Sequence, residues 1–177
     1  DSFSDGGKYH QQIDKIIEEL EPALAAGVGI IDVGAESTRP GAKALNSTQE
    51  IKRLEPLLVV LNQLKSCYSF KLSLDSFRAE TLLHFLPYLD IVNDVSGKLD
   101  SDCLRQIKDA GKSYAFMHSL TIPANPQIVL DANCDPCVEI LQWAESKLEQ
   151  LLSLGFTHNQ LICDPGIGFN KTTAQSW

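Results

Sequence analysis

The chain has 177 residues, of which 44% are hydrophobic and 21% charged, and its formal net charge is −8. Its length and composition suit one folded domain, residues 1–177, with a substantial core. The negative charge argues against a nucleic-acid-binding face, which needs clustered positive charge. No apolar run approaches the roughly 20 residues that span a bilayer.

The cysteines indicate a reducing compartment. Five are scattered along the chain, at Cys67, Cys103, Cys134, Cys137 and Cys163. An odd, irregularly spaced set argues against a disulfide framework and predicts a cytoplasmic protein with free thiols. The C-x-x-C pair, Cys134 and Cys137, has no second pair nearby, so ordinary thiols at a helix start are expected.

Apolar periodicity and turn residues predict alternating helices and strands. Helices are expected over 10–26, 78–86, 101–110 and 136–154, with one more capped by Ser47 or Thr48 and burying Ile51, Leu54, Leu58 and Leu61. Strands are expected over 29–34, 70–74, 90–92, 113–117 and 161–163. Two details are specific: the first strand should be buried on both faces, and the last helix should bury Leu141, Leu148 and Leu152. The alternation predicts a parallel sheet with helical crossovers, in a barrel or an open sheet.

Polar residues stand where the apolar strands stop. Asp75, Asn93, Asp94, His118 and Asp164 each follow a predicted strand. In parallel α/β folds the carboxyl ends of the strands form the functional edge. Asp94 directly follows Asn93, so the pleat predicts that it points to the opposite face in a structural role. His118 is expected to be a packed supporting group.

Asp75, Asn93 and Asp164 together predict a ligand site. Each carries side-chain acceptors, and convergent acceptors suit a ligand rich in N–H donors, such as a pterin, guanine or an aminopyrimidine. Asp75 alone could equally be a helix N-cap. No lysine follows a strand directly, which argues against a Schiff-base aldolase.

Two turns complete the predicted edge. The run from Ile30 to Gly41 passes from apolar to polar and should deliver Glu36, Thr38 and Arg39 at the end of its strand. The guanidinium of Arg39 suits phosphate or carboxylate. The turn over 164–169 can bring backbone close to a ligand, but it lacks the residues of a Walker loop or a dinucleotide fingerprint.

These motifs resemble the dihydropteroate synthase family of pterin-binding barrels. The resemblance rests on Asp1–Gly7 (DSFSDGG), Asp32–Gly41 (DVGAESTRPG) and Asp164–Phe169 (DPGIGF), supported by Leu74–Phe77 and Asn93–Gly97. The motifs occur in order along the whole chain. They imply a (β/α)8 TIM barrel, of which the chain covers the loop after strand 1 through strand 6.

The resemblance also implies an activity. Such an enzyme is a transferase of folate biosynthesis that joins 4-aminobenzoate to (7,8-dihydropterin-6-yl)methyl diphosphate, releasing 7,8-dihydropteroate and pyrophosphate. It implies Mg²⁺, whose Asn ligand would lie upstream, so no metal ligand is expected within this segment. It further implies a homodimer, sulfonamide binding in the aminobenzoate pocket, and no nucleic-acid or membrane partner.

Site residues follow from the same resemblance. The pterin would be held by Asp75, Asn93 and Asp164 and packed by Met117. Two mobile loops would contribute Asp1, Phe3, Asp5, Thr38, Arg39 and Pro40. Thr38 would bind the diphosphate, and Asp75 and Arg39 would be catalytic. Phe3 and Pro40 would form the aminobenzoate pocket, while Asp1 and Asp5 would help close the site.

The chain departs from the family in three respects, and two alternatives stay open. The first strand and strands seven and eight of the barrel are missing, and Ser119–Ala124 replaces a short glycine-containing loop. We therefore expect an internal segment that is inactive and poorly soluble by itself. The alternatives are a pterin-dependent methyltransferase, against which Glu36–Arg39 argues, and a non-catalytic pterin-binding domain.

Overall fold

Five parallel strands form one sheet in the computed structural model, which describes residues 13–36, 44–125 and 127–176. The strands are β1 (Ile30–Gly34), β2 (Lys71–Asp75), β3 (Ile91–Asp94), β4 (Ser113–Met117) and β5 (Leu161–Asp164). Their order in the sheet is their order in the chain. A doubly wound sheet reverses its order at a switch point, whereas a barrel adds each strand beside the last. The order therefore agrees with the prediction of successive units of a (β/α)8 barrel.

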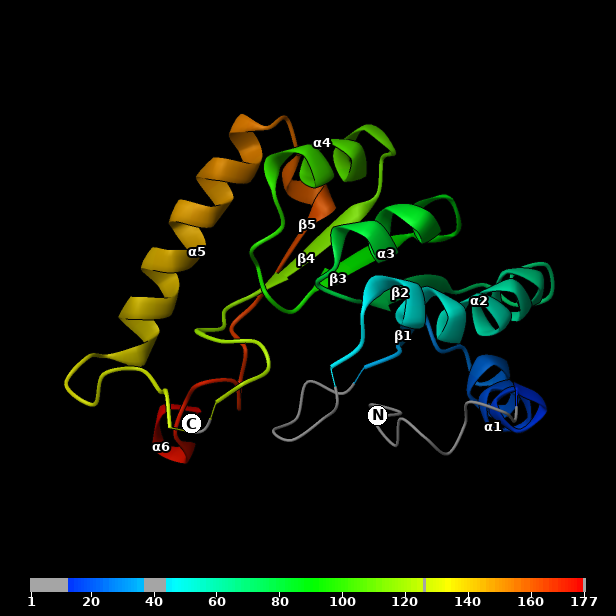
Figure 1. The fold of residues 1–177 in the computed structure, drawn as a ribbon, viewed down its shortest axis with the longest axis horizontal. Helices are drawn as coiled ribbons and strands as arrows, with labels where there is room; N and C mark the ends of the chain where they lie inside the picture. The colour runs from blue at the N-terminus through cyan, green and yellow to red at the C-terminus, as the bar shows by residue number, and fades with distance from the viewer. Residues whose placement is uncertain (1–12, 37–43, 126, 177) are drawn as a thin grey trace.

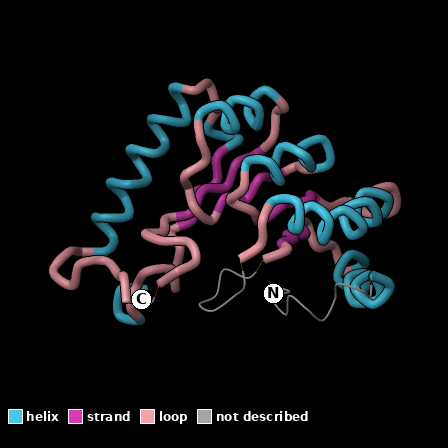
Figure 2. Tube along the Cα trace, in the orientation of Figure 1, coloured by secondary structure: helices cyan, strands magenta, loops and turns pink. Residues whose placement is uncertain are grey.

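Helices join the strands. They are α1 (Ile13–Ala25), α2 (Ser47–Leu64), α3 (Ala79–Phe85), α4 (Ser101–Asp109), α5 (Pro136–Ser153) and α6 (Thr173–Ser176), with single 3₁₀ turns η1 (Leu86–Tyr88) and η2 (His158–Gln160). Figure 1 shows α2, α3 and α4 side by side on one side of the sheet. The tube in Figure 2 shows the strands behind this helical layer. One face of the sheet is thereby covered, and the other is available for a site.

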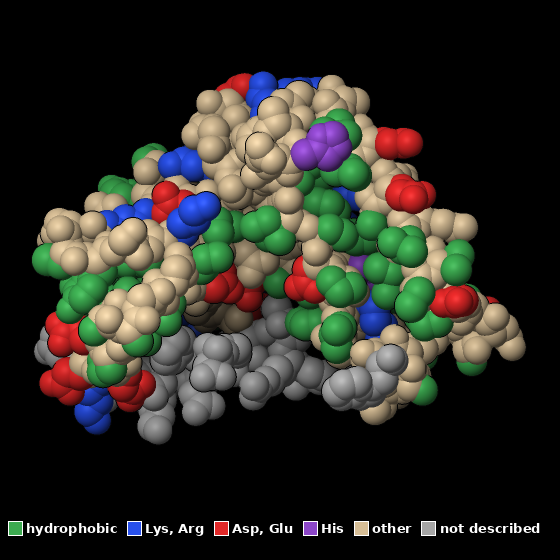
Figure 3. All heavy atoms as spheres, turned by 180° about the vertical axis from the view of Figure 1, so that it is seen from behind, with side chains coloured by type: hydrophobic (Ala, Val, Ile, Leu, Met, Phe, Trp, Pro, Cys, Tyr) green, Lys and Arg blue, Asp and Glu red, His purple; other side chains and the backbone are tan. Residues whose placement is uncertain are grey.

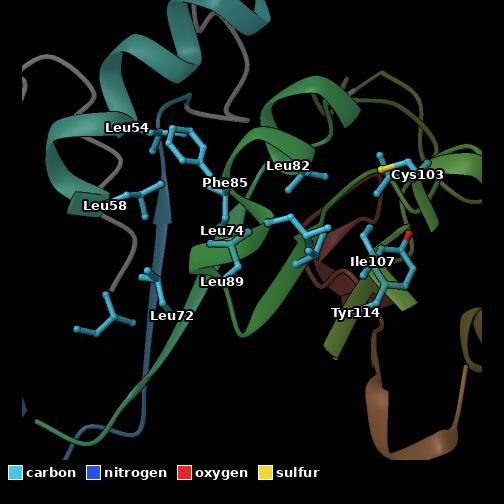
Figure 4. Close-up of a cluster of buried hydrophobic side chains, with 14 of the residues drawn as sticks. Leu54, Leu58, Leu72, Leu74, Leu82, Phe85, Leu89, Cys103, Ile107 and Tyr114 are labelled. Atoms are coloured by element: carbon cyan, nitrogen blue, oxygen red, sulfur yellow. The ribbon is translucent and has the colours of Figure 1, made fainter. Parts of the chain in front are cut away.

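The core lies between the strands and this helical layer. Alternate strand residues, Leu72, Leu74, Val92, Tyr114 and Phe116, are almost fully buried, as are Leu54, Leu58, Leu61, Leu82, Phe85, Leu104 and Ile107 from the helices. Figure 4 shows many of these side chains converging. Full burial of one such side chain stabilises the fold by roughly 1.5–3 kcal/mol. The predicted stripe of α2 therefore packs into this core through Leu54, Leu58 and Leu61, while Ile51 is only partly buried.

Helix starts follow capping chemistry. The N-cap of α2 is Asn46, not Ser47 or Thr48 as predicted, because Asn46 Oδ1 accepts from the Gln49 amide while Gln49 Oε1 accepts from the Asn46 amide. Asp135 caps α5 with Pro136 in its first turn. Each cap satisfies N–H groups that the helix itself leaves unpaired.

Two packing predictions are wrong. Strand β1 is not buried on both faces: Ile30 is 52% exposed and Asp32 is also exposed, because β1 is an edge strand of the described sheet. On α5, Leu141 is 61% exposed, and the fully buried residue is Leu151. Periodicity located an apolar stripe on α5 but not the residue of α5 that is buried in the core, Leu151.

In the described ranges, no helix combines the length and apolar character needed to cross a membrane.

Candidate functional site

The strand register brings polar side chains to the face of the sheet opposite the helices. Asp75 pairs with Gly34 on one side and with Asn93 on the other. Asp32 pairs with Ser73, which lies two residues before Asp75 on β2. Side chains two residues apart in a strand point to the same face, so the Asp32 side chain shares the face of Asp75. Figure 3, a view from behind, shows Asp and Glu side chains near the middle of the molecule.

Four predicted pterin-site residues lie on this face and edge. Asn93 of β3 pairs with Ala115 of β4, and two residues further along β4, Met117 pairs with Asp164 of β5. One carboxylate oxygen of Asp164 accepts a 2.7 Å hydrogen bond from the Gly166 amide. The structure therefore brings Asp75 and Asn93 into direct contact range and places Asp164 on the same face beyond β4. The roles of all four residues stay predictions.

Asp75 is the most perturbed acid of the site. The pKa of its carboxyl is raised from 3.8 to about 7, most strongly by burial and then by the negative charges of Asp32, Glu50, Asp94 and Glu36 in that order. Gly34 makes room for it, since a Cβ there would lie 3.4 Å from Asp75 Cβ. Near neutral pH the Asp75 carboxyl can thus either donate or accept a hydrogen bond.

Asp32 belongs to the site although the sequence analysis gave it no role there. Its Oδ2 accepts a 3.1 Å hydrogen bond from Nδ2 of Asn93, two strands away. The signal for it was visible, because Asp32 is a charged residue inside an otherwise apolar strand, Ile-Ile-Asp-Val-Gly.

Glu36 lies just beyond the carboxyl end of β1, as predicted, and has a structural role there. Its carboxylate lies 2.6 Å from the Arg78 guanidinium and accepts from the Leu45 amide at 3.1 Å. Arg78 also contacts Glu50, which is 1% exposed and accepts a 2.6 Å bond from the Thr81 hydroxyl. These bonds connect Glu36 and Leu45, on either side of the turn after β1, to Glu50 of α2 and to Arg78, which precedes α3.

The predicted residues of the two mobile loops, Asp1, Phe3, Asp5, Thr38, Arg39 and Pro40, lie outside the described residues.

Asp94 has the structural role predicted for it. It is fully buried on the helix side of β3, where it accepts from the Tyr114 hydroxyl at 2.7 Å and from the amides of Ser96 and Leu99. Burial first, and then the Asp94 charge, raise the pKa of the Tyr114 hydroxyl. The turn after β3 is thereby fixed beside Asn93.

Comparison with known proteins identifies the family. The family described as "Pterin binding enzyme" matches residues 1–177. The chain belongs to this family.

Individual relatives agree. The chain is 36% identical to a folate synthesis bifunctional protein of Chlamydia muridarum, covering 99% of this chain and 40% of that protein. It is 33% identical to a dihydropteroate synthase of Streptococcus pyogenes, covering 99% and 62%. The crystal structure of dihydropteroate synthase from Anaplasma phagocytophilum with bound 6-hydroxymethylpterin-monophosphate matches with a TM-score of 0.86 and 27% identity, over 95% of this chain and 67% of that one. The chain thus spans 40% and 62% of the length of these two curated relatives.

His118 is buried, as predicted. Its ring packs edge-on against Trp143 at 4.9 Å, and its Nδ1 lies 3.0 Å from Nζ of Lys171. Burial lowers the pKa of the imidazole, and the Lys171 charge lowers it further. Nδ1 therefore accepts from the lysine, and the neutral ring supports the end of β4.

Lys171 was missed because it stands seven residues beyond β5. Its ammonium donates to the carbonyls of His118, Gly166 and Phe169 at 3.0–3.3 Å. Burial lowers the pKa of this amine. A lysine therefore does reach the carboxyl edge of the sheet, but its three carbonyl partners and His118 occupy it as a structural cation.

Asn170 fixes the loop that replaces the expected glycine-containing one. It adopts a positive φ of 53°, and its Oδ1 accepts from the amides of Leu120 and Thr121 at 3.0 Å. Its Nδ2 donates to the Ile128 carbonyl at 2.8 Å and to Asn125. The loop after β4 is thereby fastened to the loop after β5.

No three His, Cys, Asp or Glu side chains converge as a metal site within 13–36, 44–125 and 127–176. Mg²⁺ is commonly held by only one or two carboxylates together with substrate phosphates. Such a site needs no cluster of three protein ligands, so the Mg²⁺ that the resemblance implies stays a prediction.

Proposed function

We propose that this chain is part of a dihydropteroate synthase, which joins 4-aminobenzoate to (7,8-dihydropterin-6-yl)methyl diphosphate and releases pyrophosphate. One observation carries the proposal. Asp75 and Asn93 are register partners on the face and edge that also hold Asp164, in a chain of the pterin-binding family.

The pterin would be recognised by its N–H donors. Its ring and amino group would meet the acceptors of Asp75, Asn93 and Asp164, while Met117 would pack against the ring. A buried carboxylate needs donors to offset its lost hydration, so a donor-rich heterocycle suits this site better than an acceptor-rich one.

The chemistry would depend on positioning and electrostatics. Departure of diphosphate leaves positive charge on the pterin methylene carbon, and the carboxylates of Asp75 and Asp164 would stabilise that charge. An arylamine is a competent nucleophile, so no activated side chain is needed. Thr38 would bind the diphosphate, and Arg39 would complete the closed site and exclude water, which otherwise captures the cation.

The remaining assignments stay proposals. Phe3 and Pro40 would form the aminobenzoate pocket, and Asp1 and Asp5 would help close it. Mg²⁺, when bound, would neutralise diphosphate charge. A homodimer is proposed on the family resemblance alone. A cytoplasmic location is supported by the free state of all five cysteines.

The test is pyrophosphate release in the full-length protein, with 4-aminobenzoate and the dihydropterin diphosphate, with and without Mg²⁺. Methyl transfer from methyltetrahydrofolate to a corrinoid, without pyrophosphate release, would identify the methyltransferase alternative. Pterin binding without either turnover would identify a non-catalytic domain. Calorimetry with 6-hydroxymethylpterin should show weaker binding for Asp75→Ala and Asp164→Ala. Unchanged binding in both variants would remove the basis of the proposal.

A further inference from the structure

We infer that Asp32 is a specificity-determining residue that fixes which end of the Asn93 amide faces the ligand. The inference rests on the proposed function, because the ligand it concerns is the pterin. Asp32 would not contact the reacting atoms and acts through Asn93.

The geometry is built for this contact. Strands β1 and β3 flank β2, so the Asp32 and Asn93 side chains meet across an intervening strand, while neighbouring strands lie about 4.8 Å apart. On β2, the residues of this face that lie between them are Ser73, the register partner of Asp32, and Asp75, the register partner of Asn93. The small side chain of Ser73 leaves room for the contact. The resulting hydrogen bond from Asn93 Nδ2 to Asp32 Oδ2 is 3.1 Å long.

The Asp32 carboxylate and the Asn93 amide determine which end of the amide faces the ligand. An ionised carboxylate can only accept, so it bonds the NH₂ end of the amide and turns the carbonyl end away. Asn93 then presents an acceptor, Oδ1, beside the carboxyl of its register partner Asp75. Without Asp32 the amide could rotate and present its donors instead. A ligand N–H would then face another N–H and lose its partner, while ligands with acceptors at that point would gain one.

An exchange of the two side chains tests this directly. Asn93→Asp places a carboxylate beside Asp32, with no donor between them. Adding Asp32→Asn restores a donor–acceptor pair, now with the donor at position 32, and leaves an acceptor at position 93 for the ligand. If position 93 had to present a donor, the exchanged pair could not bind, because a carboxylate has none.

Binding of 6-hydroxymethylpterin would be measured by calorimetry at pH 8 in the full-length protein, with thermal unfolding to verify folding. We expect Asn93→Asp to weaken binding at least about tenfold, because the hydrogen bond between positions 93 and 32 is lost. The exchanged pair should return to within about threefold of wild type. Asp32→Asn alone should weaken binding less than Asn93→Asp, because the new amide can still offer its carbonyl.

Asp32→Leu combined with Asn93→Asp is the matched control. It removes the same charge with a side chain of similar size but supplies no donor, so it should not restore binding. Equal rescue by leucine, or no rescue by the exchange in folded protein, would overturn the inference. A wild-type protein that binds no pterin would instead refute the proposed function.

Discussion

Replacing Asp75 with asparagine should stabilise the protein while removing its function. The pKa of Asp75 rises from 3.8 to about 7, through burial first and then through Asp32, Glu50, Asp94 and Glu36. Each tenfold change in proton affinity is about 1.4 kcal/mol, so ionising this carboxyl weakens the native state by about 4 kcal/mol. Because the folded pKa exceeds the unfolded one, the native state holds the extra proton between about pH 4 and 7. The free energy of unfolding therefore falls as pH rises through that window.

The assay is urea unfolding of wild type and Asp75→Asn in the full-length protein at pH 5 and pH 8. The variant cannot ionise, so its advantage should rise from about 1.5 kcal/mol at pH 5 to about 4 kcal/mol at pH 8. Asp90→Asn is a control of opposite sign. Burial would raise the pKa of Asp90, but hydrogen bonds from Lys65 and from the Leu72 amide outweigh it and lower that pKa. This carboxylate thus stabilises the fold above its unfolded pKa, and its replacement should destabilise at both pH values. Equal effects of Asp75→Asn at pH 5 and pH 8 would refute the electrostatic account.

Three further predictions concern the supports of the site. Arg78→Met should cost about 3 kcal/mol in urea unfolding, because it leaves two nearly buried carboxylates unpaired; Arg78→Lys should cost less, and equal costs would show that charge pairing contributes little. Gly166→Ala should lower the melting temperature far more than Gly168→Ala. Both glycines have positive φ, which costs a side chain about 1–2 kcal/mol. Only a Cβ at Gly166 would also meet a carbonyl oxygen, that of His118, at 2.1 Å. Lys171→Met should speed amide hydrogen exchange in 118–130 and 164–170, since it removes the shared donor of three carbonyls; unchanged exchange would argue against the tether.

Element positions were readable from the sequence because each strand is short, apolar and closed by polar or glycine residues. Strand β4 was predicted at its observed bounds, Ser113–Met117, and the others within one or two residues. The sequence did not predict correctly which residues of β1 and α5 are buried. The exposed Ile30 and Leu141 are apolar, and their exposure depends on which elements lie beside β1 and α5. Periodicity records apolar positions, whereas burial depends on partners that lie far away in the chain.

Some residues of the candidate site could likewise be predicted from the sequence, and others could not. Asp75, Asn93 and Asp164 could be predicted because they terminate strands, and all strand ends of a parallel sheet share one edge. Asp32 was missed because it acts from inside a strand, through a side chain two strands away. Lys171 was missed because it returns to the edge from beyond the strand. Such returns are set by loop geometry, which no local sequence pattern encodes.

The acidic side chains on the uncovered face of the sheet lower the stability of the fold and favour ligand binding. Unlike the apolar core, Asp32 and Asp75 repel one another, and the described donors near them are few: the Asn93 amide, and the Gly166 amide at Asp164. A donor-rich ring would supply the missing N–H groups, and positive charge developing on it would be attracted by the same carboxylates. Removing an acid should therefore stabilise the empty protein and weaken ligand binding. A variant such as Asp75→Asn that gains stability at pH 8 yet loses pterin affinity would show both effects in one side chain.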